Sequence, residues 1–142
     1  MITTLSPYLH FDGNCEQAFR FYHRIFGGEL SPITRFKDFP SDIPLTEDEG
    51  KRVLHILLPI NPQTTLIGSD QSLHFDPELK MGNNVSIAIN VPSQSEAERL
   101  FNGLSENGTI TTPLEKTFWG AWFGMFTDQF GIHWMISHDK KQ

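Results

Sequence analysis

The second half of this 142-residue chain repeats the hydrophobic pattern of the first half at an offset of 80 residues. Apolar and polar residues alternate at 5–11, and the same alternation returns at 85–91. A period of two is typical of a β-strand that buries one face. Apolar residues at helical spacing follow each segment, at 15–26 and again up to residue 104. Two copies of one supersecondary unit predict a duplicated fold whose halves share one cavity.

Each half is predicted to follow the order βαβββ. The expected elements of the first half are strands at 5–11, 30–36, 53–60 and 64–69 and a helix at 15–26, with Asn14 and Gln17 as its cap. Those of the second half are strands at 85–91, 109–118, 121–127 and 131–137 and a helix opened by the capping-box residues Ser93 and Glu96. The first module thus covers about 3–70, the connection 71–83 and the second module about 84–138, within a single domain of residues 1–142.

Composition and charge narrow the classes of protein and partner. Eleven Lys and Arg against 17 Asp and Glu give a net charge of −6, which argues against a sequence-independent grip on nucleic acid or on an anionic membrane. The single cysteine cannot form an internal disulfide, and neither a secretion signal nor a long apolar run is evident, so we expect a cytoplasmic protein. Residues 37–51 combine two prolines with clustered acids and no periodicity, which indicates a mobile loop.

Two strings carry a resemblance to a known family. They are LSPYLHFDGNCEQAFRFY at 5–22 and FWGAWFGMFTDQFGIHWMI at 118–136, with GSD at 68–70 between them. Together with the paired βαβββ pattern they resemble the PhnB-like branch of the vicinal oxygen chelate superfamily, which includes glyoxalase I and the bleomycin-resistance proteins. The resemblance implies an α+β fold in which two pseudo-repeated βαβββ modules form a curved, mainly antiparallel sheet around a cavity. It also implies a homodimer that binds a small organic ligand.

The same branch often carries the label 3-demethylubiquinone methyltransferase. The sequence has neither the glycine-rich strand-to-helix turn nor the parallel βαβ pattern of a methyl-donor site. Methyl transfer is therefore not expected of this chain.

Metal-dependent members of the superfamily hold their metal at four strand positions with His or Glu side chains. The resemblance places these positions at Ser6, Gly68, Ser86 and Met135. A neutral hydroxyl is a poor ligand for a hard or borderline divalent metal, and a thioether is a soft one. We therefore expect no standard metal centre and no cofactor, and whether the chain is an enzyme stays open.

The candidate ligand-pocket residues are polar or aromatic side chains on the strands and turns of the two modules. They are Tyr8, His10, His55, Asn90, Trp119, Trp122, His133 and Met135. The three histidines could form a displaced metal site, supply a general base, or simply line the pocket. The two tryptophans could line an aromatic-binding cavity or a dimer interface, whereas Trp134 is expected in the core.

The remaining residues whose side chains could take part in chemistry each have a structural as well as a functional interpretation. His23 and His138 are expected at the surface, and His74 could cover the mouth of the pocket. Cys15, in the first turn of a helix, is either a thiol with a lowered pKa or a buried cysteine. Asp70 and Asp128 are expected to form turns by binding their own neighbouring backbone amides.

Three functions follow from this pattern. The leading one is a non-metal small-molecule-binding protein that sequesters a planar or amphipathic compound, using chiefly Tyr8, His10, Asn90 and His133. The second is a metal-dependent lyase, isomerase or dioxygenase with relocated histidine ligands and a carboxylate such as Asp70. The third is a non-catalytic interaction module whose pocket has collapsed.

Overall fold

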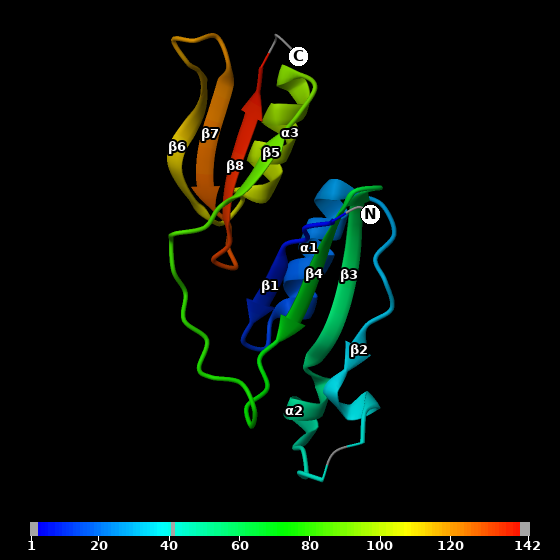
Figure 1. Cartoon of the computed structure of the whole chain (residues 1–142). Helices are drawn as coiled ribbons and strands as arrows, with labels where there is room; N and C mark the ends of the chain where they lie inside the picture. Colours follow the sequence, from blue (N-terminus) through cyan, green and yellow to red (C-terminus); the bar gives the residue numbers. More distant parts are fainter. Residues whose placement is uncertain (1–2, 41, 140–142) are drawn as a thin grey trace. The chain divides into compact units, whose positions relative to one another are not determined.

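A computed structural model describes residues 3–40 and 42–139, and the chain divides into two compact units at the Lys80–Met81 bond. The first unit contains β1 (Tyr8–Phe11), α1 (Cys15–Phe26), β2 (Thr34–Arg35), the short 3-10 helix η1 (Phe36–Asp38), α2 (Glu47–Lys51), β3 (Val53–Asn61) and β4 (Thr64–Asp70). The second contains β5 (Ile87–Asn90), α3 (Gln94–Leu104), β6 (Thr109–Lys116), β7 (Trp122–Thr127) and β8 (His133–His138). The unit boundary falls inside the connection at 71–83 (Figure 1).

Both units build the same four-stranded sheet. The strand order is β1-β4-β3-β2 in the first unit and β5-β8-β7-β6 in the second. The pairs β1/β4 and β5/β8 are parallel, and all other pairs within these two sheets are antiparallel. The predicted α+β class, with two βαβββ modules and mainly antiparallel pairing, is confirmed.

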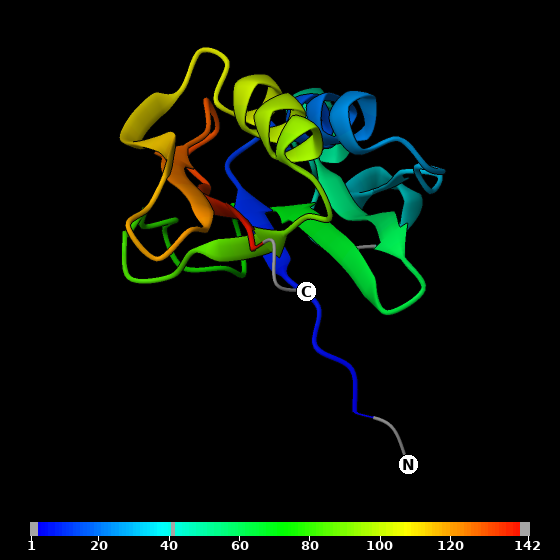
Figure 2. The ribbon, with the colours of Figure 1, turned by 90° about the horizontal axis from the view of Figure 1, so that it is seen from above.

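One helix covers one face of each sheet (Figure 2). In the first unit α1 packs on β3 and β4 through an aromatic cluster in which Phe19 meets Phe11 and Tyr22 edge to face, with ring centroids 6.3 and 5.7 Å apart. In the second unit Phe101 of α3 meets Phe126 at 5.1 Å. These aromatic and aliphatic side chains give each unit its own core.

The region between α1 and β3 differs from the prediction. The strand expected at 30–36 is reduced to β2, because Pro32 has no N–H for a ladder and the Ser31 hydroxyl accepts the Leu57 N–H in place of a backbone carbonyl. The segment interpreted as a mobile loop contains η1 and α2. Thr46 caps α2 through the Glu49 N–H, and Glu49 binds the Thr46 N–H in return.

The first strand of each module is shorter at its start than predicted. β1 begins at Tyr8 rather than at residue 5, and β5 begins at Ile87 rather than at residue 85. Leu5 and Val85 are 87% and 72% exposed, so neither contributes to the core of its unit. None of the helices in the described part of the chain is long and apolar enough to cross a membrane.

Candidate functional site

The sheet of the first unit has one face against α1 and an opposite face, here called the open face. On β1 the side chains of Leu9 and Phe11 are buried, while Tyr8 and His10 are exposed. This is the strand phase expected from the sequence. The Tyr8 and His10 rings lie nearly parallel, 9° apart, with centroids separated by 4.6 Å, so they form a stacked aromatic pair on this face.

Ser69 and His55 extend this surface across the neighbouring strands. Ser69 pairs with His10 in the parallel β1/β4 register, and its hydroxyl lies 3.3 Å from His10 Nδ1. His55 is the exposed residue that precedes Ile56, which is fully buried and pairs with Gly68. His10 and His55 therefore lie on the same face, on the two strands that flank Ser69.

In the second unit, Asn90, His133 and Met135 share the open face. They alternate with Trp134 and Ile136, which are buried on the α3 side. The His133 ring is fixed at both nitrogens: Nε2 donates to the Gly82 carbonyl at 2.6 Å, and Nδ1 lies 2.8 Å from the Thr127 hydroxyl. An imidazole held in this way lines the face but offers no lone pair to a metal.

The structure separates the two tryptophans that the sequence paired. Trp122 pairs with His138 and shares its phase with Gly124, where a Cβ would overlap the ring of Phe101 in α3. Trp122 thus lies on the α3 side of β7 rather than on the open face, and its role in a pocket or a dimer interface stays a prediction. The sequence reasoning missed Phe123 and Met125, which face the open side in its place.

Trp119 lies on the turn between β6 and β7, outside the sheet. It is 59% exposed and packs edge to face against Phe118, which is 98% exposed. Of the two roles left open for Trp119, an interface contact fits this position better than a place on the sheet face.

The four family metal positions carry a donor set that does not fit a divalent ion. Ser6 and Ser86 are exposed and lie just outside β1 and β5, and Met135 offers only a thioether. Gly68 faces α1 rather than the open side, because a Cβ there would overlap the Phe19 ring. Across residues 3–40 and 42–139, three or more His, Cys, Asp or Glu side chains nowhere gather as a metal site would require.

Asp70 has a structural role that differs from the turn former predicted for it. Its side chain is 2% exposed, and Oδ1 accepts the N–H groups of Gly13 and Cys15 at 2.8 and 3.0 Å. Oδ2 accepts the Val53 N–H at 2.9 Å. Asp70, at the end of β4, therefore caps α1 from a distant part of the chain. The side chain of Asn14, the N-cap residue of the helix, makes no capping hydrogen bond.

Asp128 forms its turn as predicted and does more. It accepts the N–H groups of Phe130 and Ile132, and its Oδ2 accepts the buried Trp134 indole N–H at 2.8 Å. Trp134, 1% exposed, is in the core as expected.

Cys15 is fully buried, and burial, assisted by the Asp70 and Glu16 carboxylates, raises the pKa of its thiol. The helix dipole does not lower this pKa as one alternative supposed, because desolvation dominates. The structural interpretation of Cys15 is the one that fits.

The other histidines are bonded locally. His138, expected at the surface, is only 9% exposed, and its Nδ1 lies 2.9 Å from the Val91 carbonyl. His23 is half-buried, with Nε2 at 2.9 Å from the Gly28 carbonyl. His74 pairs with Glu49, which ties the connection to α2 within the first unit.

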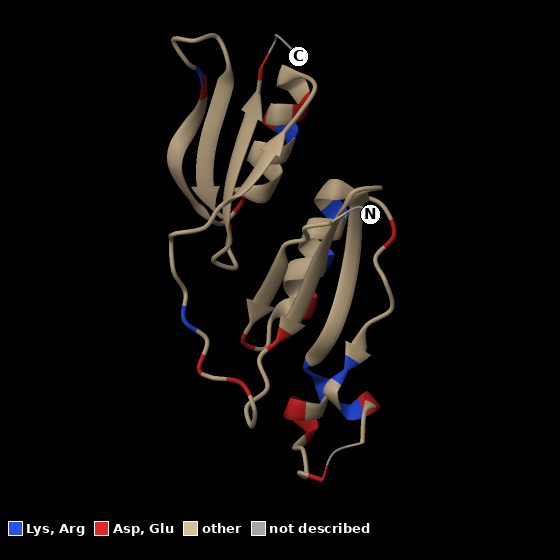
Figure 3. Ribbon diagram, viewed as in Figure 1, with Lys and Arg blue, Asp and Glu red and all other residues tan. Residues whose placement is uncertain are grey.

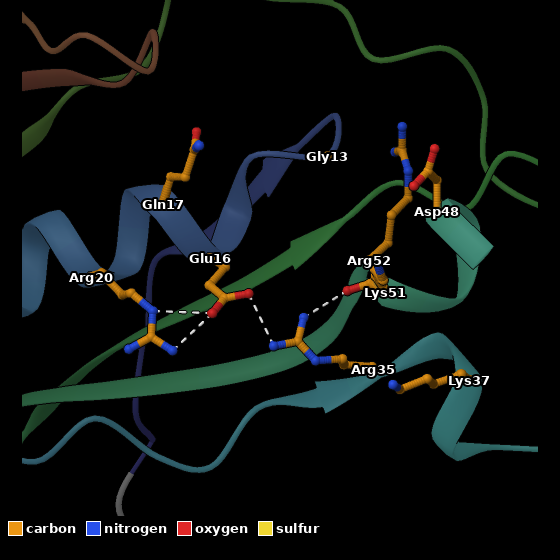
Figure 4. A pocket seen from close by; sticks show the side chains of 9 residues that line it. All are labelled: Gly13, Glu16, Gln17, Arg20, Arg35, Lys37, Asp48, Lys51 and Arg52. Atoms are coloured by element: carbon orange, nitrogen blue, oxygen red, sulfur yellow. Dashed lines mark hydrogen bonds and ion pairs between the residues drawn. The ribbon is translucent and has the colours of Figure 1, made fainter.

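The structure also shows a charged hollow of about 740 Å³ in the first unit that the sequence reasoning missed (Figure 4). Its lining residues come from the first turns of α1, from β2 and η1, and from α2. They are Gly13, Glu16, Gln17, Arg20, Arg35, Lys37, Asp48, Lys51 and Arg52. The sequence did contain an indication of this hollow. Arg35 and Lys37 lie at the start of the acidic segment 37–51, and Lys51 and Arg52 lie at its end. Pairing of β2 with β3 brings these two ends together.

Comparison with known proteins identifies the family. The family model described as 3-demethylubiquinone-9 3-methyltransferase matches residues 3–137. The chain belongs to this PhnB-like family. Its relatives include YjdN of Escherichia coli strain K12, 30% identical over 145 residues and covering 97% of each chain.

Solved structures share the fold of the PhnB-like chain. Protein PA1353 from Pseudomonas aeruginosa is 40% identical, with a TM-score of 0.82 over 97% of this chain and 98% of its own. A Bacillus cereus PhnB protein, titled a putative 3-demethylubiquinone-9 3-methyltransferase, is 22% identical, with a TM-score of 0.75 over 96% and 100%. A glyoxalase/bleomycin resistance protein/dioxygenase superfamily member from Sphaerobacter thermophilus shares the fold at 18% identity, with a TM-score of 0.62 over 98% of each chain.

Proposed function

We propose that this PhnB-like protein is a cytoplasmic, homodimeric small-molecule-binding protein that works without the standard divalent metal centre of its superfamily. The observation that carries the proposal is the stacked Tyr8–His10 pair on an exposed sheet face, bonded to Ser69. At the metal positions of that unit the chain carries Ser6 and Gly68, so binding would rest on the shape and polarity of this face.

The chemistry of the open faces favours a planar or amphipathic compound. The stacked Tyr8 and His10 rings form an aromatic pair onto whose outer ring face a further aromatic ring can stack, at little cost in side-chain entropy. The Tyr8 hydroxyl and the His55 ring add polar groups around it. In the second unit Asn90 and His133 supply the polar groups, beside the apolar surface of Met135. Sequestration of such a compound is the activity that this arrangement supports best.

The metalloenzyme alternative finds less support in the residues it would need. Asp70 uses both carboxylate oxygens on backbone N–H groups on the α1 side, and both nitrogens of His133 are hydrogen-bonded. The collapsed-module alternative required Trp119, Trp122 and Met135 to fill one pocket. The exposed turn position of Trp119 and the α3-side position of Trp122 do not support that packing.

Fluorescence titration with the neutral aromatic probe N-phenyl-1-naphthylamine tests the proposal. We expect saturable binding that the double substitution Tyr8→Ala/His10→Ala weakens about tenfold, since two stacking contacts of roughly 0.5–1.5 kcal/mol are lost. His23→Ala, which removes a histidine from α1, is the matched control and should change affinity less than twofold. Equal affinity in all three proteins would contradict the proposed sheet-face site.

Plasma mass spectrometry tests the metal-free part of the proposal. Tag-free protein incubated with Mn, Fe, Ni or Zn and then desalted should retain well under one ion per chain, because hydroxyl and thioether donors bind these ions weakly. Retention of about one ion per chain would overturn this part. Native mass spectrometry of the isolated protein would then show any co-purified organic ligand by its added mass.

A further inference from the structure

The positive charge of the chain is concentrated in one place although the protein as a whole is acidic. Five of its eleven Lys and Arg residues line the charged hollow of the first unit, against two acidic residues in the same lining. Figure 3 shows blue residues around β2, η1 and α2 and along α1, with red residues beside them on η1 and α2. A local excess of cations in a concave surface lowers the energy of an anion there, whatever the sign of the total charge.

The fold brings these cations together through a specific backbone arrangement. The Phe36 N–H donates to the Arg52 carbonyl at 3.1 Å, and the Arg35 guanidinium donates to the Lys51 carbonyl at 2.7 Å. A second Arg35 nitrogen donates to Glu16 Oε1 of α1 at 3.0 Å. Arg35 thus connects the β2–β3 edge to the helix, and each of its bonds uses one of five N–H donors. Its remaining N–H groups are available to a ligand.

Glu16 does not cancel the positive potential of the hollow. Its carboxylate binds Arg20 at 2.8 Å as well as Arg35, so one negative charge holds two guanidinium groups in position (Figure 4). The hydrogen bond from Arg20, with a further contribution from Arg35, keeps the pKa of Glu16 below its ordinary value. The carboxylate therefore remains charged and ordered, and it orients both arginines.

The far side of the hollow carries three further cations. The Arg52 side chain is only 18% exposed, binds Asp12 and the Gln71 carbonyl, and lies against Gly13. Within residues 3–40 and 42–139, Lys51 pairs only with the exposed Glu47, and Lys37 has no carboxylate in ion-pair distance. A hydrogen-bonded arginine next to exposed lysines is a combination that suits recognition of clustered anionic oxygens.

We propose that the charged hollow binds a small molecule carrying at least two neighbouring oxyanion groups, with a diphosphate as the best-matched chemistry. Arginine guanidinium groups recognise phosphate oxygens in pairs, and the cations of the hollow come both from α1 and from the segments around β2, η1 and α2, so two neighbouring oxyanion groups could meet both sets. The volume of about 740 Å³ is that of a small-molecule site. This site is formed by α1, β2, η1 and α2, and it does not depend on the open-face site proposed above.

Isothermal titration calorimetry with pyrophosphate, at about 20 mM ionic strength to limit screening, tests the site in the full chain. We expect Lys37→Ala/Lys51→Ala to weaken binding about tenfold, because it removes two exposed, charge-assisted contacts without disturbing the core. The matched control is Lys80→Ala/Lys116→Ala, which changes the net charge equally at exposed sites elsewhere. Its affinity should stay within twofold of the unmodified protein.

Two further variants test the donor geometry and the local charge of the hollow. Arg35→Lys keeps the charge and loses the paired donor geometry, so it should weaken pyrophosphate about tenfold. Asp48→Asn removes a lining carboxylate and should tighten binding about threefold. Titration with citrate distinguishes a polycarboxylate ligand from a diphosphate. If citrate bound as tightly as pyrophosphate, the hollow would recognise clustered oxyanions in general rather than diphosphates in particular.

Three results would overturn the proposal. They are the lack of measurable pyrophosphate binding at millimolar concentration, equal weakening by both double-lysine variants, and preferential binding of a single-stranded oligonucleotide. The last result would indicate a nucleic-acid surface rather than a small-molecule site. Because N-phenyl-1-naphthylamine is uncharged, its binding to Lys37→Ala/Lys51→Ala should be unchanged, which separates failure here from failure of the open-face site.

Discussion

Asp70 is the residue on which the start of α1 and the start of β3 both depend. One carboxylate accepts three backbone N–H groups from segments 17 to 57 positions away in the chain. The helix N-terminus leaves N–H groups without intrahelical partners, and a charged acceptor satisfies them more strongly than a neutral side chain. Asp70 of the GSD string at 68–70 can take this role because it lies at the end of β4.

Replacing Asp70 by Asn tests this role. The NH₂ group of the new asparagine cannot accept a hydrogen bond, so one of the buried backbone N–H groups loses its partner. We therefore expect a loss of about 1–3 kcal/mol in the free energy of unfolding. Urea denaturation measures it. The control is Asp12→Asn, which removes an exposed ion pair with Arg52 and should cost less than about 1 kcal/mol. Similar losses in the two variants would contradict the capping role.

The buried Cys15 thiol makes a pH-dependent contribution to stability. Burial raises the pKa of this thiol in the folded state, while in the unfolded chain it titrates near pH 8.5–9. The folded state therefore holds the proton more tightly, and its advantage is complete below about pH 8.5 and declines as the pH rises further. Urea unfolding of the unmodified protein should lose up to about 1.36 kcal/mol per pH unit above that point relative to Cys15→Ala. Parallel pH profiles of the two proteins would contradict this account.

At the scale of elements, close packing between helix and sheet requires glycine at the points of nearest approach. Gly68 of β4 lies under the Phe19 ring of α1, and Gly124 of β7 lies under Phe101 of α3. The two units therefore use the same device, although β4 and β7 are not equivalent strands in the two sheet orders. A larger residue at either position would separate the helix from its sheet.

Gly68→Ala measures the tightness of this packing. We expect a loss of about 1–3 kcal/mol in the free energy of unfolding, because the added methyl group must displace the Phe19 ring. Adding Phe19→Leu should return part of that loss, so that the double variant is more stable than the sum of the single changes predicts. Gly82→Ala, at an exposed position with room for a methyl group, should stay within about 0.5 kcal/mol. If the losses in unfolding free energy of the two single variants simply added in the double variant, the residue at position 68 would not press against the Phe19 side chain.

At the scale of the whole molecule, exposed apolar side chains indicate a partner surface. Phe118 is 98% exposed and Trp119 is 59% exposed, and they contact each other on the β6–β7 turn. An exposed aromatic pair of this kind is typical of an association surface rather than of a solvated turn. The homodimer implied by the family resemblance stays a prediction, and this aromatic pair is a candidate for its interface.

Sedimentation equilibrium tests the homodimer. The expected mass is twice that of the 16.2 kDa chain at micromolar concentration. Phe118→Ala/Trp119→Ala should weaken association at least tenfold if these rings are buried between protomers, and Thr112→Ala, an exposed change on β6, should not alter it. A monomer in the unmodified protein would contradict the dimer, and an unchanged dimer in the double variant would place the interface elsewhere.

The sequence by itself determined the repeat, the phase of each first strand and the α+β class. These are properties of local hydrophobic spacing, so Leu9 and Phe11 are buried and Tyr8 and His10 exposed as the alternation predicted. Only the tertiary structure decided the roles of residues whose partners are distant in the chain. Asp70 caps α1 from β4, Trp122 is set on the α3 side by its register with His138, and Arg35 meets Lys51 across the β2–β3 edge. Strand register and sheet order place these contacts, and neither is encoded in the spacing of nearby residues.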